Sequence, residues 1–401
     1  MSGRKVIRSA PARQDLRDTS QTFPAGLYVH VPFCTAFCSY CDFASEIHKP
    51  AVVERYLKAL EKELCARLAE LAAVAPFVPR TVYIGGGTPS ALDVTELACL
   101  FDLLERNLNL ESVEEFTIEA NPGSVDAAKL ELLRRRGVNR ISFGVQSFQP
   151  RLLKLLGRIH GPEDGRQAVR LARAAGFADV SIDLMHGLPT QSLEELRRDI
   201  DEAASLRTEH VSAYGLSYEE DTPLYRAVER GELAPLPAEE EARQYLTAIE
   251  LLEEAGLKQY EISNFARPGR ESRHNLLYWR NESYLGVGAS AASFLAWQRS
   301  TNHSGVTVYL KAVEATGKAT EISEVLDASA RAREALVLEL RLRRGVSMEE
   351  FKARWGVDCL TSSPLLPGFL QEKLMEVTDD GRYRISRQGL PVADSILAEF
   401  V

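Results

Sequence analysis

The sequence predicts an α/β protein: an open, TIM-like partial barrel of six parallel strands, three quarters of a full ring, followed by a C-terminal α+β region that ends in a winged-helix-like module. Three observations predict this fold. Short β-rich runs alternate with longer amphipathic patterns through the first 238 residues. Six such units are too few to close an eight-stranded barrel. Chemically unusual residues follow the ends of the expected strands, where the active face of such a barrel lies.

The expected strands are short apolar runs bounded by turns or helical patterns. In chain order they cover residues 27–31, 81–84, 115–120, 140–143, 180–184 and 210–214. Amphipathic patterns between them predict helices over residues 51–71, 94–104, 126–136, 165–175 and 193–206, each ending near a glycine, a proline or a polar turn. The alternation of strand and helix places the strands parallel in one sheet.

Polar residues or glycines stand at the ends of five of these strands. They are the cysteines after the first strand, Gly85 to Gly87 after the second, Glu119 at the end of the third, Gln146 after the fourth and Asp183 in the fifth. Because the carboxyl ends of parallel strands meet at one face of the sheet, we expect these residues to share one site.

The pattern changes near residue 239. A helix to Ala255 precedes an aromatic and glycine-rich stretch, and a set of short helices with a hairpin through Asp380-Gly381 begins near residue 327. The expected segments are a disordered N-terminus (1–24), the barrel (25–238), a second region (239–326) and the winged-helix-like module (327–401). That module carries eleven basic and twelve acidic residues, so it lacks the positive charge that DNA reading needs, and we expect it to pack or to bind a partner.

Charge and hydropathy exclude several classes of partner. The 401 residues include 48 Lys and Arg against 57 Asp and Glu, a formal net charge of −9, so nucleic acid is not an expected partner. No apolar run approaches the roughly 18 residues that a membrane span requires, and no secretory core follows the polar start. We expect a cytoplasmic protein without a transmembrane segment, for which peripheral membrane contact stays open.

Three of the six cysteines lie within eight residues of one another, and the others are scattered. The clustered ones are Cys34, Cys38 and Cys41. In a reducing compartment such a cluster favours a metal or iron–sulfur site over disulfides. Three thiolates in one loop can ligate three irons of a [4Fe-4S] cluster, whose fourth iron then stays open. The alternative is a structural zinc with His30, Asp42 or His48 as the fourth ligand.

The other strand-end residues suit a ligand with polar groups. Glycines in Gly85-Gly86-Gly87-Thr88-Pro89 let a ligand approach the backbone more closely than any Cβ would permit. This turn is not a phosphate-binding P-loop, because no Lys-Ser or Lys-Thr pair follows. Glu119 is suited to accept a hydrogen bond from a ribose hydroxyl. Asp183 lies inside an apolar strand, where an unpaired charge is costly, so it should have a partner or a ligand.

Together these motifs resemble the radical S-adenosylmethionine (radical SAM) family of oxygen-independent coproporphyrinogen III oxidase and its relatives. The resemblance extends from about residue 25 to 401 and includes the Glu-x-Asn-Pro, Gly-Val-Gln and Asp-Leu-x-x-Gly-Leu-Pro segments. It implies a radical SAM barrel with a [4Fe-4S] cluster on Cys34, Cys38 and Cys41. It also implies a pocket for S-adenosylmethionine (SAM) lined by Tyr28, Tyr40, Gly86, Gly87, Thr88, Glu119, Gln146, Arg158 and Asp183.

Two features separate the branches of this family. The oxidases resemble Cys-x3-Cys-x2-Cys-x-Cys, whereas Phe43 stands at the fourth cysteine position here. The segment from Arg273 to Trp279 is similar to the His-Asn-x-x-Tyr-Trp motif of the heme-chaperone (HemW) branch. An imidazole can be an axial iron ligand, and Tyr and Trp rings offer flat apolar surface to a porphyrin. The resemblance therefore implies a heme site at His274, Asn275, Tyr278 and Trp279.

One segment departs from the family's pattern. Relatives commonly read Gly-x-Gly-x-Gly-Ala-His where this chain has Ser290 in place of a glycine and Ala292 in place of the histidine. If that histidine helps to hold heme in relatives, heme binding here would be weaker or differently ligated. His303 is a reserve ligand that no motif supports.

The first functional hypothesis is a radical SAM heme chaperone that binds the cluster, SAM and heme, takes an electron from a donor protein and delivers heme to respiratory haemoproteins. The alternative is an enzyme, oxygen-independent coproporphyrinogen III oxidase, which makes protoporphyrinogen IX in porphyrin biosynthesis. The missing fourth cysteine disfavours the oxidase. The sequence does not decide whether a chaperone of this kind cleaves SAM. A third class, a zinc-stabilised interaction protein, would leave the strand-end residues without a role.

Overall fold

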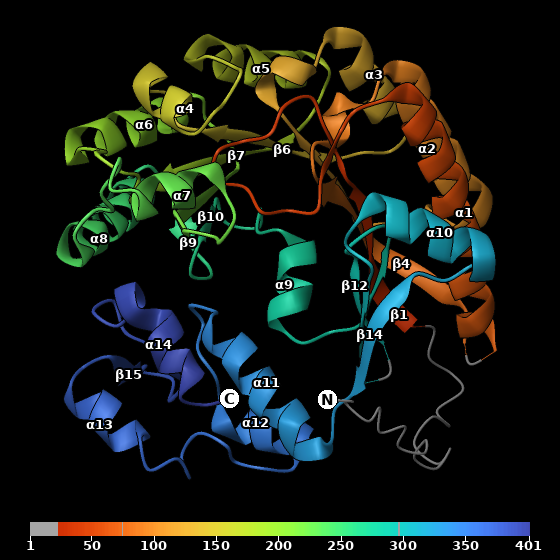
Figure 1. Ribbon diagram of the computed structural model, residues 1–401. Helices are drawn as coiled ribbons and strands as arrows, with labels where there is room; N and C mark the ends of the chain where they lie inside the picture. The colour runs from red at the N-terminus through yellow and green to blue at the C-terminus, as the bar shows by residue number, and fades with distance from the viewer. Residues whose placement is uncertain (1–22, 74, 296) are drawn as a thin grey trace.

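A long, curved, open sheet forms the centre of the protein. The computed structural model describes residues 23–73, 75–295 and 297–401, so the disorder expected for residues 1–24 concerns positions almost all outside the described residues. The strand order is β14-β13-β12-β11-β1-β4-β5-β6-β7-β8-β10-β9, and in the described residues the two ends of this sheet do not pair with each other. The expected partial barrel is therefore present, with helices around its outer side (Figure 1).

All six expected barrel strands are present and run parallel to one another. They are β1 (Phe23–Val31), β4 (Phe77–Gly86), β5 (Glu115–Ala120), β6 (Arg140–Gln146), β7 (Asp179–His186) and β8 (His210–Gly215). Val82, Ile118 and Ile182 are fully buried in them. Along β5, β7 and β8 apolar residues alternate with polar ones such as Glu119, Asp183 and Ser212, so that one face of each strand is apolar and the other lines the cavity.

The helices of the barrel follow the strands. They are α1 (Pro50–Ala72), α2 (Val94–Asn107), α3 (Ala127–Arg135), α4 (Pro150–Leu155), α5 (Pro162–Ala174), α6 (Leu193–Ser205), α7 (Pro223–Glu229) and α8 (Ala238–Glu254). Capping boxes start α2 at Asp93 and α6 at Ser192. Neither α4 nor α7 was expected from the sequence, because helices of six and seven residues are too short to show a clear helical period.

The region from residue 239 to 326 adds strands to both edges of the barrel sheet. Its elements are β9 (Lys258–Gln259), β10 (Asn264–Ala266), α9 (Arg273–Trp279), β11 (Tyr284–Val287), β12 (Ala292–Leu295), β13 (Gln298–Asn302), α10 (Val306–Thr316) and β14 (Thr320–Val325). β11 pairs with β1 as a further parallel strand, and β10 pairs antiparallel with β8. The second region is thus continuous with the barrel sheet. This continuity could not be recognised in the sequence, because the strands that provide it are only two to six residues long.

The C-terminal module has the expected order of helices and a hairpin. It contains α11 (Ala328–Leu340), α12 (Met348–Trp355), α13 (Leu366–Gln371), β15 (Met375–Val377), β16 (Tyr383–Ile385) and α14 (Ala393–Ala398). Gly381 has a φ of 77° in the hairpin turn, a conformation that glycine adopts without strain. The module joins the barrel through a bridge between Glu261 and Leu342.

The short helix α9 lies inside the arc of the barrel, between the sheet and the C-terminal module (Figure 1). It packs against β4 on one side and α11 on the other. The carboxylate of Glu115, at the start of β5, accepts hydrogen bonds from Ser272 Oγ and from the amides of Arg273 and His274. A buried side chain of the sheet therefore caps this helix. In the described part of the chain, no helix has the length and hydropathy to span a membrane.

Candidate functional site

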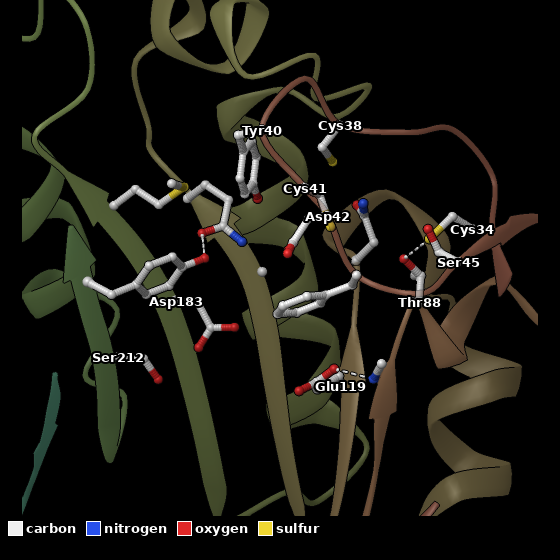
Figure 2. Close-up of a pocket in the computed structure, with 18 of the residues that line it drawn as sticks. Cys34, Cys38, Tyr40, Cys41, Asp42, Ser45, Thr88, Glu119, Asp183 and Ser212 are labelled. Carbon is white, nitrogen blue, oxygen red and sulfur yellow. Dashed lines mark hydrogen bonds between the residues drawn. The ribbon is translucent and has the colours of Figure 1, made fainter. Parts of the chain in front are cut away.

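A cavity with a volume of ≈ 580 Å³ lies at the carboxyl ends of the barrel strands. The cysteine loop forms one side, and the ends of β4 to β8 form the other (Figure 2). The expected site residues that line it are Cys34, Cys38, Cys41, Tyr40, Gly86, Gly87, Thr88, Glu119, Gln146, Arg158, Asp183, Asn275 and Trp279. Residues far apart in the sequence are therefore brought together here, and the volume is that of a site for one drug-sized ligand.

The cysteine loop is held at its base and at its tip. At the base, the short strands β2 (Phe33–Cys34) and β3 (Glu46–Ile47) pair, and the His48 amide donates to Cys34 O at 2.9 Å. At the tip, the Ser39 amide donates to Leu156 O at 3.0 Å, and Ser39 O accepts from the Leu224 amide at 2.8 Å. These contacts fix the loop over the strand ends with its three half-buried cysteines facing the cavity (Figure 2).

The surroundings of the cysteines suit a negatively charged iron–sulfur cluster. Arg158 Nη1 donates to Cys38 Sγ at 3.2 Å, and Thr88 Oγ1 lies 3.5 Å from Cys34 Sγ. Hydrogen bonds to the sulfurs are among the features that tune such clusters. In residues 23–73, 75–295 and 297–401, no three His, Cys, Asp or Glu side chains converge on one ion. A cube distributes its cysteines over three separate irons, so it does not require that convergence.

Two of the three residues considered as a fourth zinc ligand are engaged elsewhere. The ring nitrogens of His30 lie 3.0 Å from Tyr28 Oη and 3.0 Å from Ala44 O. His48 Nε2 lies 2.7 Å from a carboxylate oxygen of Glu96. Asp42 does line the cavity. These contacts favour the cluster over a zinc site that uses either histidine.

The glycine turn after β4 is shaped by its contact with the cysteine loop. The Gly87 amide donates to Val31 O, and the Thr88 amide donates to Phe33 O. A Cβ on Gly87 would lie 2.9 Å from Phe33 N, and Gly86 has a φ of 112° with the His30 ring against it. The turn therefore needs glycine because its backbone packs directly against the backbone of the cysteine loop, and glycine also leaves room for a ligand.

Glu119 is the last residue but one of β5, and its side chain lines the cavity. Tyr83 Oη donates to Glu119 Oε1 at 2.6 Å, and the Gly86 amide donates to Oε2 at 3.0 Å. Burial raises the pKa of Glu119 to about 7, while these two hydrogen bonds lower it and the nearby Asp183 raises it. A carboxyl group fixed in this way can accept from, or donate to, a hydroxyl pair on a ligand.

Asp183 has the polar partners that its place in an apolar strand requires. Ser142 Oγ donates to Asp183 Oδ1 at 3.0 Å, and Ser212 also hydrogen-bonds the carboxylate. Burial raises the pKa of Asp183 to about 6, although both serines and Arg158 lower it. Gln146, held with a φ of 69° at the end of β6, accepts from Tyr214 Oη at 2.7 Å. Such a strained backbone is typical of functional sites.

Replacing Asp183 by asparagine is expected to change the pH dependence of stability. The unfolded chain ionises near the ordinary pKa of 3.8 and the folded chain near 6, so the wild type loses stability as pH rises through this window. The Asp183→Asn protein lacks this loss, so its free energy of unfolding relative to wild type should rise between pH 4 and 8. The rise should be at most about 3 kcal/mol, because water in the cavity screens the charge of Asp183. Urea unfolding at several pH values measures it. The exposed Asp201→Asn change is the control, and equal profiles for all three proteins would contradict the prediction.

Tyr28, expected in the SAM pocket, lies behind the cavity. Its hydroxyl hydrogen-bonds His30, and its ring stacks on Tyr83 at 6.2 Å between centroids. Tyr83 itself lines the cavity and binds Glu119. In the arrangement described, Tyr28 therefore supports the cavity wall through Tyr83 and does not form part of its lining.

The histidine of the His-Asn-x-x-Tyr-Trp segment is enclosed in the protein. His274 has no exposed surface; its Nδ1 lies 2.7 Å from Thr81 Oγ1 and its Nε2 lies 2.8 Å from Tyr278 Oη. Burial lowers the pKa of His274 to about 3, so the ring is neutral. Asn275 and Trp279, on the same helix, line the cavity, whereas His274 and Tyr278 do not belong to its lining.

Several cavity residues were not anticipated from the sequence. They are Tyr83, Ser212, Tyr214, Glu261, Asn264 and Arg341. Ser212 and Tyr214 belong to an expected strand, so their alternation along it was the signal that could have found them. Glu261, Asn264 and Arg341 carry no local signal, because tertiary contacts alone bring them to the cavity.

The two departures from the family's glycine segment lie outside the cavity lining. Ser290 has a φ of 61°, a left-handed conformation that suits the glycine of relatives, and its amide donates to His303 O. Ala292 begins β12. His303 Nδ1 lies 3.5 Å from Glu321 Oε1 beside the edge strand β14. These residues act on the packing of the sheet edge rather than on the cavity.

Comparison with known proteins gives both family matches and relatives. Residues 28–203 match the Radical SAM superfamily, and residues 326–392 match the HemN C-terminal domain. The heme chaperone HemW of Bacillus subtilis is 37% identical over 93% of this chain and 98% of its own length. HemW of Lactococcus lactis is 35% identical over 94% and 97%. The structure of coproporphyrinogen III oxidase (HemN) from Escherichia coli, 24% identical over 94% of this chain and 90% of that one, superposes with a TM-score of 0.81, which is a similarity of fold.

Proposed function

Because this chain belongs to the HemW family of heme chaperones, within the radical SAM superfamily, we propose that it binds heme and delivers it to haemoproteins. Its resident cofactors are a [4Fe-4S] cluster on Cys34, Cys38 and Cys41 and SAM beside it. We further propose respiratory haemoproteins as acceptors, a separate electron donor and a cytoplasmic location, with peripheral contact at the membrane where acceptors lie.

The cavity residues have distinct parts in holding SAM. When bound, the cluster offers an open iron to the amino and carboxylate groups of SAM and can supply it with an electron. Glu119 and Asp183 are placed to bind hydroxyl groups, and Gly86 and Gly87 leave room beside the backbone. Arg158, near Cys38, supplies positive charge next to the cluster. Gln146, fixed by Tyr214, presents its amide to the same space.

The observation that carries the chaperone function is similarity over nearly the full length of relatives named heme chaperones. The oxidase has the same fold at only 24% identity. Phe43 occupies the position of the fourth cysteine of the oxidase motif, and its side chain is 64% exposed at the cavity rim. The oxidase similarity nevertheless justifies testing that activity directly.

The heme site in this proposal includes Asn275 and Trp279, which line the cavity. His274 can ligate iron only after Thr81 or Tyr278 releases a ring nitrogen, because both nitrogens are hydrogen-bonded. With both nitrogens hydrogen-bonded, His274 instead orients α9 by joining it to Thr81 of β4. The two roles predict different spectra for heme bound to a His274 variant.

A hemin titration beside an activity assay tests the proposed function. We expect the anaerobically reconstituted protein to bind hemin tightly and to form no protoporphyrinogen from coproporphyrinogen III with SAM and a reductant. Formation of protoporphyrinogen would make the protein the oxidase, and absence of hemin binding would refute the chaperone function. The titration repeated with His274→Gln separates the two roles: ligation predicts a changed heme spectrum, and orientation predicts weaker binding with the same spectrum.

A further inference from the structure

The lining of the cavity includes a polar corner formed by four residues, here called the joint corner. They are Glu261 and Asn264 from the segment around β10, Trp279 at the end of α9 and Arg341 just after α11. The backbone bridge between Glu261 and Leu342 holds the first and last of these segments together. The joint corner therefore forms only where the barrel sheet meets the C-terminal module.

Each of the four side chains has a buried polar atom to which no partner in the described residues is bonded: Glu261 Oε2, Asn264 Oδ1, Trp279 Nε1 and Arg341 Nε. Glu261 is fully buried, and only its Oε1 is satisfied, by the Ser263 amide at 3.0 Å and by Asn264 Nδ2 at 2.5 Å. Buried polar groups are normally hydrogen-bonded, so four in one corner of a cavity indicate a polar ligand group.

The donors of the joint corner have a fixed orientation. The guanidinium of Arg341 lies over the Trp279 ring, with Cζ 4.6 Å from the ring centroid. Its Nη1 reaches the exposed Asp394 at 3.3 Å, a surface ion pair of small strength. Stacking holds the planar guanidinium, and a guanidinium binds carboxylates with good geometry. The indole N–H adds a second donor beside it.

We propose that the joint corner is a carboxyl-binding subsite that takes a propionate side chain of the tetrapyrrole. This inference rests on the proposed function and extends it by naming the ligand group and the residues that recognise it. Arg341 and Trp279 donate to the propionate, and Asn264, whose Nδ2 donates to Glu261 Oε1, positions the Glu261 side chain beside it. Burial raises the pKa of Glu261 above its usual range, which favours the neutral carboxyl, the form that can donate to a carboxylate.

The size of the cavity supports a side chain rather than a whole macrocycle as the occupant. A volume of ≈ 580 Å³ corresponds to about one drug-sized ligand. In this proposal SAM lies beside the cysteines, and a flexible acid arm of the tetrapyrrole reaches the joint corner beside Trp279.

The test compares hemin with hemin dimethyl ester, in which both propionates are esterified, on the reconstituted protein. We expect the wild type to bind hemin at least about tenfold more tightly than the ester, which corresponds to about 1.4 kcal/mol. Arg341→Met removes the guanidinium, and Trp279→Phe keeps an aromatic ring but removes the N–H. Each change should bring the ratio of the two affinities closer to one. Arg344→Met, which changes an exposed arginine three residues away, should keep it.

The outcomes separate the subsite from the proposed function. Tight and equal binding of hemin and the ester by the wild type would overturn the subsite and leave the chaperone function standing. Failure of both ligands to bind would overturn the chaperone function itself. Glu261→Gln places a neutral amide, with a hydrogen-bond donor, at the same position and should retain the preference. A preference unchanged in both Arg341→Met and Trp279→Phe would also refute the proposal.

Discussion

Replacing Cys41 by alanine is expected to abolish retention of the iron–sulfur cluster while the barrel stays folded. Cys41 is one of three half-buried cysteines that the loop presents to the cavity, and a cluster held by three thiolates has no spare protein ligand. The loop itself is anchored by backbone hydrogen bonds at Ser39 and His48, which the substitution leaves intact. Iron and acid-labile sulfide per chain, with the visible absorption of the anaerobically reconstituted protein, measure the loss.

The matched control is Cys99→Ala, since Cys99 is an exposed cysteine on α2 outside the cavity lining. It should keep a full cluster, and both variants should keep the circular dichroism of the wild type. A full cluster in Cys41→Ala would show that the ligand assignment is wrong. A colourless wild-type protein that retains zinc after reconstitution would support the zinc-stabilised class instead.

Replacing Glu115 by alanine is expected to destabilise the protein by about 3 to 5 kcal/mol, because three hydrogen bonds to a buried carboxylate are lost. The amides of Arg273 and His274 and the hydroxyl of Ser272 would be left without their acceptor. These groups begin α9, so the position of Asn275 and Trp279 in the cavity should also be disturbed. Urea unfolding measures the free energy, and hemin titration measures the effect on the ligand.

The neighbouring Glu114 offers a close control. It is exposed and forms surface ion pairs with Arg80 and Arg273, so Glu114→Ala should cost less than about 1 kcal/mol. Both glutamates lie in the same short segment, and only one of them points into the protein. Equal destabilisation by the two changes would refute the role of Glu115 as the cap of α9.

Much of the fold could be predicted because its signals are local. Each barrel strand is a short apolar run before a helical pattern, and Glu119 and Asp183 stand out as charges in such runs. The strands of the second region could not be recognised in the same way. β10 and β11, with three and four residues, are strands only because β8 and β1 offer them an edge. Their pairing depends on tertiary contacts, and the segments themselves are too short to show a periodic pattern of apolar residues.

The sequence alone predicted an iron–sulfur site on the cysteine loop and placed this loop after the first strand, because clustered cysteines and the order of the strands are local patterns along the chain. The tertiary structure decided which side chains of α9 face the cavity. It enclosed His274 between Thr81 and Tyr278 and left Asn275 and Trp279 on the surface of the cavity. The cap on that helix comes from Glu115, 159 residues before His274. Hydrogen bonds and packing between segments so far apart depend on the folded sheet, so no pattern along the chain records them.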